Sequence, residues 1–338
     1  MFQRHCGSGV TWTECADSEG DKLRISAVVV AYNRRELLTE ALAALAAQSR
    51  ALDSIVVVDN ASTDGSAEAA EAACPDADVV RLARNTGGAG GFAVGIERAI
   101  TTHGADLVWI MDDDTIPSPT ALAALLDVRD RLPVTPVVLA SKVVWTDGSD
   151  HPMNTPRRKP FLGRSERVSA EGAGAIAVRS ASFVSSLVDA RAVAQSGLPI
   201  AEYFIWNDDF EFTARLLRDG VGVYCPASVV THKTKALAST DGDPGSRFYY
   251  EVRNKVWLFR RSRALATWEV PVYVAASLVR WTRTFVKSQD RATLISGLRR
   301  GLRDGFTTSP RRNADFLAGL EPATSAIAQF DAAAGPAR

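Results

Sequence analysis

Cysteine is scarce in this chain, and its pattern excludes two kinds of stabilised fold. The 338 residues contain four cysteines: Cys6, Cys15, Cys74 and Cys225. They are scattered and form no C-x-x-C pair, which argues against a disulfide framework or a zinc cluster. A reducing cytosol is therefore the expected compartment.

Long apolar runs are also missing. A membrane-spanning helix needs about 20 consecutive apolar residues, and the nearest candidate, Val270–Val279, is too short and is closed by Arg280. Residues 1–22 lack the apolar segment of a signal peptide, so we expect a disordered leader. Neither a spanning helix nor export is predicted.

The chain has no excess of charge of either sign. Its 39 Lys and Arg residues balance 39 Asp and Glu residues. Bulk charge therefore gives no indication of nucleic-acid binding, and none is expected. At roughly 100–200 residues per domain, the length fits one large domain or two smaller ones.

What the first half does contain is an alternation of strand and helix patterns. Four apolar runs predict strands at Ile25–Ala31, Ser54–Val58, Val79–Leu82 and Leu107–Met111. Helical spacing between them predicts helices at Arg35–Gln48, Ser66–Ala73 and Gly90–Thr102. This order indicates βαβ units, hence an α/β fold with a mostly parallel sheet.

The second half is less regular. We expect a long loop over Trp145–Glu171 and a strand over Val221–Val230 that ends near His232. A helical region follows over residues 236–308, and residues 309–338 are expected to form a flexible tail.

All four predicted strands of the first half end in polar residues. These ends read Tyr32-Asn33-Arg34, Asp59-Asn60, Arg84-Asn85 and Asp112-Asp113-Asp114. Parallel sheets bind ligands beyond the carboxyl ends of their strands. Loops are polar anyway, so chance could produce one or two such ends, but all four together favour a built site.

Two acidic groups and one histidine could carry chemistry. Adjacent carboxylates such as Asp112–Asp114 repel one another unless a cation neutralises them, and Mg²⁺ or Mn²⁺ prefers oxygen ligands. The alternative is a solvated acidic turn. Asp208 and Asp209 lie among aromatic residues, where a carboxylate can become a general base, or they simply begin a helix. His232 is a metal ligand or a structural histidine.

As an ordered set, these segments resemble the inverting family-2 glycosyltransferases with the GT-A fold. The similarity covers about Leu23 to Lys235, so residues 23–235 would form the catalytic domain. The matching stretches are Val28–Arg34, Val56–Ser66, Arg84–Ile96, Trp109–Pro117, Tyr203–Leu216 and the His232 segment.

The resemblance implies a role for each candidate residue. Tyr32, Asn33, Asp59, Arg84, Asn85, Asp112 and Asp113 would bind the nucleotide sugar, with Asp59 on the uracil edge. Asp112, Asp114 and His232 would bind a divalent metal, Mn²⁺ or Mg²⁺. Asp209 would be the catalytic base, and Trp206, Asp208, Glu211, Arg253 and Asn254 would contact the acceptor.

Within the family, the chain is most similar to actinobacterial galactofuranosyltransferases that start cell-wall galactan. The triple Asp, the glycine-rich stretch after Arg84 and Arg247–Asn254 carry this similarity. It implies UDP-galactofuranose as donor and a polyprenyl-diphosphate-linked glycan as acceptor. Rhamnosyltransferases that use dTDP-rhamnose share these features, so the sugar stays open.

Three other functions fit parts of the sequence. A dinucleotide-dependent oxidoreductase would fit Gly88–Ala93, which satisfies the G-x-G-x-x-A pattern, but this stretch follows the third strand, whereas that fingerprint normally follows the first. A nucleotidyltransferase would need a glycine- and basic-rich loop where Ala31–Glu36 stands. A non-catalytic glycan-binding protein would not need Asp112, Asp114, Asp209 and His232 together.

The helical region is basic and aromatic around a short apolar segment. Phe248, Tyr249 and Tyr250 lie near several arginines, and Val270–Val279 follows. This pattern suits a helix in the membrane interface, although a core helix pair with a basic surface would also fit. We expect peripheral attachment to the inner face of the plasma membrane; the oligomeric state stays open.

Overall fold

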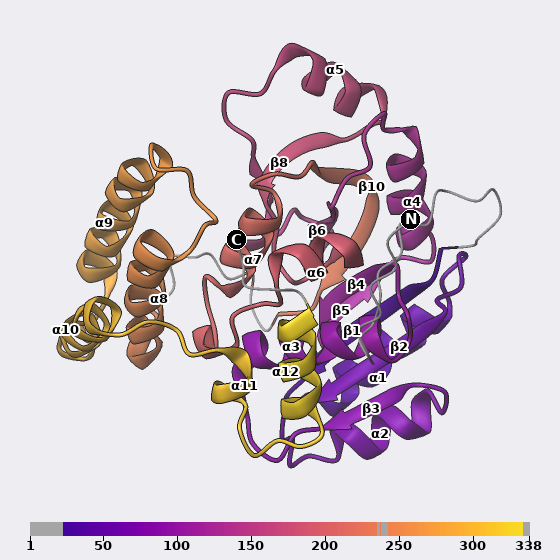
Figure 1. Cartoon of the computed structure of the whole chain (residues 1–338), viewed down its shortest axis with the longest axis horizontal. Helices are drawn as coiled ribbons and strands as arrows, with labels where there is room; N and C mark the ends of the chain where they lie inside the picture. Colours follow the sequence, from indigo (N-terminus) through magenta and orange to yellow (C-terminus); the bar gives the residue numbers. More distant parts are fainter. Residues whose placement is uncertain (1–22, 235–236, 238–242, 334–338) are drawn as a thin grey trace, which may run out of the picture.

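The computed structural model describes residues 23–234, 237 and 243–333. Its first part alternates strands with helices, as the sequence predicts (Figure 1). The elements are β1 (Ile25–Ala31), α1 (Arg35–Ala46), β2 (Ser54–Asp59), α2 (Ser66–Ala73), β3 (Asp78–Arg81), α3 (Gly87–Thr101) and β4 (Leu107–Asp112).

The middle part completes the sheet. It contains β5 (Thr115–Pro117), α4 (Ala121–Arg131), β6 (Val138–Val144), the 3-10 helix η1 (Pro152–Asn154), β7 (Arg157–Arg158), α5 (Arg164–Gly172), β8 (Ile176–Ser180), β9 (Ser186–Asp189), α6 (Ala190–Ser196), η2 (Ala201–Tyr203), α7 (Asp208–Leu216) and β10 (Gly222–His232). The strand order among described residues is β3-β2-β1-β4-β9-β6-β10-β8-β7, with β5 beside β10. The predicted α/β class with a mostly parallel central sheet is confirmed.

The register of the parallel strands aligns the polar strand ends that the sequence analysis identified. Ala31 of β1 lies opposite Asp59 of β2, and Val30 lies opposite Asp112 of β4. The carboxyl ends of β1, β2 and β4 therefore meet at one edge of the sheet. This is where a parallel α/β sheet binds its ligands.

Helices cover both faces of this sheet, and β1 shows why its sequence is apolar throughout. Val28 and Val30 pack with α3 on one face, whereas Ala27 and Val29 pack with α1 on the other. All seven residues of β1 are buried. A strand buried on both faces reads as a continuous apolar run, because successive side chains point to opposite faces.

The expected loop over Trp145–Glu171 contains more structure than the sequence indicated. It holds η1, β7 and the nine-residue helix α5. Ala170 is the one buried residue of α5. A helix that buries so little of its surface has no apolar stripe, and such a stripe is the signal by which a sequence predicts a helix. The expectation of an unstructured loop was wrong for this reason.

The C-terminal part is helical, with η3 (Gly245–Arg247), α8 (Phe248–Arg261), α9 (Glu269–Lys287), α10 (Arg291–Thr307), α11 (Asn313–Phe316) and α12 (Ala323–Ala333). Figure 1 shows α8, α9 and α10 grouped beside the sheet domain. Glycines let α10 approach α8 closely: a Cβ on Gly301 would lie 2.8 Å from the Cβ of Val252. No helix of the described ranges is long and apolar enough to span a bilayer.

The expectation of a flexible tail after residue 308 is wrong as far as residue 333. Helices α11 and α12 return to the sheet domain, and α12 packs on α3. Leu317 and Ile327 are fully buried in the core that lies on this face. The Ala-rich composition concealed an apolar face that only packing reveals.

The expected leader, residues 1–22, lies outside the described residues.

Candidate active site

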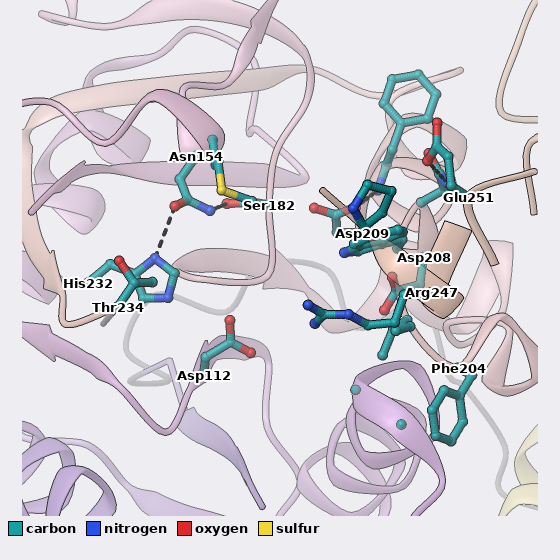
Figure 2. A pocket seen from close by; sticks show the side chains of 18 of the residues that line it. Asp112, Asn154, Ser182, Phe204, Asp208, Asp209, His232, Thr234, Arg247 and Glu251 are labelled. Carbon is teal, nitrogen blue, oxygen red and sulfur yellow. Dashed lines mark hydrogen bonds between the residues drawn. The ribbon is translucent and has the colours of Figure 1, made fainter. Parts of the chain in front are cut away.

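A cavity of about 840 Å³ opens at the carboxyl ends of β1 and β4. Its walls come from the sheet domain on one side and from α8 and α9 on the other. Figure 2 shows Asp112 and His232 on one side of this cavity, facing Asp208 and Asp209 on the other. The two acidic groups that the sequence singled out therefore share one site.

Asp112, Asp114 and His232 form the cluster that could hold a metal ion. One ligand atom of each lies within 4.8 Å of the others. Strand β10 brings the histidine there, because His232 pairs with Thr115 in the short strand that follows the aspartates. The expected metal ligands are thus brought together by a strand pairing.

Asn154 orients the histidine. Its Oδ1 lies 3.0 Å from Nδ1 of His232, while Nε2 of His232 lies 3.0 Å from Oδ1 of Asp114. If Nδ1–H donates to Asn154, Nε2 presents its lone pair to the aspartate. Asn154 lies in η1, inside the expected loop, so no sequence signal marked it.

The environment perturbs all three aspartates. Burial, with the charge of Asp114, raises the pKa of Asp112 to about 6, and burial raises the pKa of Asp113 to about 7. Burial also opposes ionisation of Asp114, but His232 and Arg34 outweigh it and lower the pKa of Asp114. Arg34 contacts the carboxylates of Asp113 and Asp114 directly.

These residues fit a hard divalent cation. The buried Oδ1 of Asp114 has no hydrogen-bond donor of acceptable geometry, although Nε2 of His232 lies beside it. A carboxylate oxygen and an imidazole lone pair at that separation need a proton or a cation between them. Two carboxylates and one imidazole suit Mn²⁺ or Mg²⁺.

Asp208 and Asp209 begin α7 on the opposite wall. Burial raises the pKa of Asp209, whereas the N–H of Phe210, 2.6 Å away, and the charges of Lys255 and Arg157 lower it. The pKa of Asp208 is raised well above its usual value by burial and by Asp209. The nearby charges of Lys255 and Arg157 therefore favour the ionised form of Asp209, which a base requires.

The loop that leads into α7 has an unusual backbone. Phe204, Trp206 and Asn207 have φ angles of 66°, 65° and 65°, which side chains other than glycine rarely adopt. The loop also presses on the start of α3, where a Cβ on Gly87 would lie 2.0 Å from the carbonyl oxygen of Phe204. Such strain clusters at functional sites.

Three expected acceptor residues do not line the cavity. Glu211 is buried and bonds Arg215 and Ser262. Asn254 donates to the carbonyls of the strained loop, and Arg253 donates to the carbonyl of Glu202 just before it. We therefore propose that Asn254 and Arg253 position the loop. Trp206 and Asp208 do line the cavity.

The expected donor residues divide in a similar way. Tyr32, Asn85, Asp112 and Asp113 line the cavity. Asp59 and Asn33 do not line it: Asp59 is buried, and Oδ1 of Asn33 accepts the N–H of Thr63 at 2.8 Å. Arg84 lies outside the cavity, where it donates to the carbonyl of Phe316 at 2.6 Å and stacks on that ring.

Sequence comparison identifies the family. The model for "Glycosyl transferase family 2" matches residues 26–182. Galactofuranosyltransferase GlfT1 of Mycobacterium tuberculosis is 30% identical over 254 residues, covering 67% of this chain and 79% of that protein. This chain belongs to glycosyltransferase family 2. GlfT1 of Mycolicibacterium smegmatis is 32% identical over 58% of this chain and 66% of its own length.

Solved structures agree on the architecture. S. aureus TarS 1-349 in complex with UDP superposes with a TM-score of 0.59 at 17% identity, over 91% of this chain and 89% of that chain. GalNAc-T7 with UDP, GalNAc and Mn²⁺ superposes with a TM-score of 0.57 at 15% identity, over 85% and 56% of the two chains. The expected GT-A fold of this family-2 glycosyltransferase is confirmed.

Proposed function

We propose that this family-2 glycosyltransferase transfers galactofuranose from UDP-galactofuranose, with inversion, to a polyprenyl-diphosphate-linked glycan in cell-wall galactan synthesis. The observation that carries the chemistry is the cavity in which Asp209 faces Asp112, Asp114 and His232. In this proposal, residues 23–235 form the catalytic domain, and residues 236–308 face the acceptor and the membrane.

The donor binds along the sheet edge. Asp112, Asp114 and His232 would hold Mn²⁺ or Mg²⁺, which offsets the negative charge of the departing diphosphate. Tyr32, whose N–H donates to Asp113 at 3.0 Å, borders the nucleoside position. The GalNAc-T7 structure, which contains Mn²⁺, has the same fold, and this supports such a use of the cluster.

Asp209 receives the proton of the acceptor hydroxyl. It stands across the cavity from the cluster that would hold the leaving group, so the hydroxyl it activates attacks the anomeric carbon from the opposite face. One displacement of this kind inverts the anomeric configuration without a covalent sugar–enzyme intermediate. The raised pKa of Asp209 brings it closer to the working range of a general base.

The similarity to GlfT1 favours galactofuranose, and a second donor has support of its own. A rhamnosyltransferase of Mycobacterium tuberculosis that acts on N-acetylglucosaminyl-diphospho-decaprenol is 27% identical over 82% of this chain. A donor panel decides between them: UDP-galactofuranose, dTDP-rhamnose, UDP-glucose and GDP-mannose, each with a polyprenyl-diphosphate acceptor analogue. Turnover with dTDP-rhamnose alone would replace galactofuranose in the proposal.

Attachment to a membrane would bring the enzyme to a lipid-linked acceptor. Helix α9 buries only Glu269, Ser277 and Trp281 of its 19 residues, whereas Val272, Val279 and Val286 are 60%, 51% and 69% exposed. These valines recur at helical spacing on one face. Elsewhere on the same helix, Arg280, Trp281 and Thr284 line the cavity. An interfacial α9 would therefore place the cavity beside the lipid.

Sedimentation with anionic liposomes tests this attachment. The double substitution Val272→Asp and Val279→Asp should reduce the bound fraction and should leave transfer to a short soluble acceptor unchanged. Val134, 59% exposed on the sheet domain, offers a matched control as Val134→Asp. Equal sedimentation of the α9 variant and the wild type would show that this face does not meet the membrane.

A further inference from the structure

The wall of the cavity that carries Asp209 also holds a group of cations with no role so far. Apart from Arg34, the cationic side chains lining the cavity among described residues are Arg157, Arg247, Lys255 and Arg280. Arg157 comes from β7, and the other three come from the consecutive elements η3, α8 and α9, about 90 residues or more further along the chain. Figure 2 shows the Arg247 side chain beginning beside Asp208 and extending its guanidinium into the cavity, between the Asp209 side and the Asp112 side.

Lys255 is the buried member of this group. It is 4% exposed, and its ammonium makes no hydrogen bond or ion pair within the described residues, although it lies 5.2 Å from the ring centre of Phe210. Burying an ammonium without a partner is costly. Burial accordingly lowers the pKa of Lys255 to about 8, despite the nearby charge of Glu251.

The two outer arginines also lack carboxylate partners among described residues. Arg157 lies over the rings of Phe210 and Tyr273, 5.3 and 5.8 Å from their centres. Arg247 lies over the ring of Trp206 at 5.6 Å. Stacking on an aromatic face fixes a guanidinium and leaves its N–H groups free to bind an anion.

Carboxylates neutralise the positive charge of this wall only in part. Arg280 pairs with Glu251 at 2.5 Å, and Glu251 also accepts from Asn207 and from Trp281. Asp243 lines the cavity as well, but its carboxylate accepts from Ser288 and from a backbone N–H. An uncharged acceptor would leave Lys255 buried without a partner.

We propose that Arg157, Arg247, Lys255 and Arg280 form a subsite for a phosphate or diphosphate group of the acceptor. The inference rests on the proposed function in one respect, since it assigns the Asp209 side of the cavity to the acceptor. The donor's diphosphate would lie at Asp112 and Asp114 on the other side. Arginines and lysines that converge on one space are the usual receptor for phosphate oxygens.

A binding experiment tests the subsite without transfer. The full chain, saturated with UDP and Mn²⁺, is titrated with geranyl diphosphate in a calorimeter. The wild type should bind this sugar-free lipid diphosphate, and Arg247→Gln and Lys255→Met should each weaken binding by about tenfold. Arg261→Gln, on the exposed end of α8, is the matched control and should change nothing.

Two results of the titration would overturn the subsite. Equal affinity in the wild type and both variants would mean that these cations do not meet the anion. Competition with UDP, instead of binding alongside it, would mean that the lipid diphosphate occupies the donor position. Because Arg247 is exposed, its variant remains informative if the buried Lys255→Met variant fails to fold.

Measurements of KM then distinguish a role of these cations in acceptor recognition from an effect on the catalytic base, Asp209. With a donor chosen by the panel, one glycan is offered on a lipid diphosphate and on a neutral alkyl chain. Arg247→Gln should raise KM about tenfold for the diphosphate acceptor only. Equal losses on both acceptors would assign these cations to Asp209 and reject the subsite. Absence of transfer from every donor, with binding intact, would support the subsite and reject the proposed function.

Discussion

Asn254 allows a sharp test of how the helical region controls the catalytic loop. Its side-chain amide is fully buried and lies 2.9, 3.0 and 2.8 Å from the carbonyl oxygens of Tyr203, Ile205 and Trp206. These bonds hold a loop with several residues at positive φ, and each such residue costs roughly 1–3 kcal/mol. The loop in turn sets the position of Asp209.

Removing the amide should therefore reduce both stability and turnover. Asn254→Ala loses about two net hydrogen bonds, since one amide has two N–H groups, and it leaves buried carbonyls without donors. At about 0.5–1.5 kcal/mol per bond and about 1–3 kcal/mol for the unpaired carbonyls, we expect the free energy of unfolding to fall by about 2–6 kcal/mol. A displacement of the base by about 1 Å can lower kcat by about 100-fold.

Three measurements check this expectation. Urea denaturation gives the change in stability, initial rates give kcat, and calorimetry gives UDP affinity. This affinity should survive, because Asn254 contacts none of the expected donor residues. Asn254→Asp removes the donor with little change of shape and should behave similarly. Gln289→Glu, the same amide-to-carboxylate change at an exposed position, is the control. Normal kcat in a folded Asn254→Ala protein would refute the positioning role.

Four further predictions concern the cavity. Mn²⁺ should raise the Tm of the wild type, by about 2.7 kcal/mol of added stability at 100 times Kd, whereas His232→Ala should remove this effect and EDTA should abolish transfer. Asp209→Asn should lower kcat by about 10²–10⁴-fold with UDP affinity retained. Lys255→Met removes a charge that lowers the pKa of Asp209, so that pKa rises; because a base acts when deprotonated, the acid limb of kcat/KM should move to higher pH. Asp59→Ala should weaken UDP binding in calorimetry.

Each of these predictions can fail in a specific way. An unchanged Tm with Mn²⁺, together with full activity in excess chelator, would remove the metal from the site. Loss of UDP affinity in Asp209→Asn with normal turnover would move Asp209 to the donor side. An acid limb that stays in place in Lys255→Met would show that another group titrates. Unchanged UDP affinity in Asp59→Ala would exclude Asp59 from the nucleotide site.

The sequence alone determined the half of the fold whose elements bury themselves in a regular pattern. Ile25–Ala31 and Ser66–Ala73 have the predicted bounds, and β2, β3, α3 and β4 differ by a few residues at their ends. Continuous apolar runs and helical spacing are local signals of burial. The position of the site could also be predicted from the polar strand ends, because βαβ topology brings successive carboxyl ends to one edge of the sheet.

Tertiary structure decided which residues belong to the site. Asn154 meets His232 across 78 residues of chain, Asn254 reaches a loop about 50 residues before it, and Arg84 turns away to Phe316. Helix α12 covers α3 although its composition resembles a loose tail. Each of these contacts depends on how separate elements pack, and the energy of a long-range contact leaves no periodic trace in the residues on either side of it.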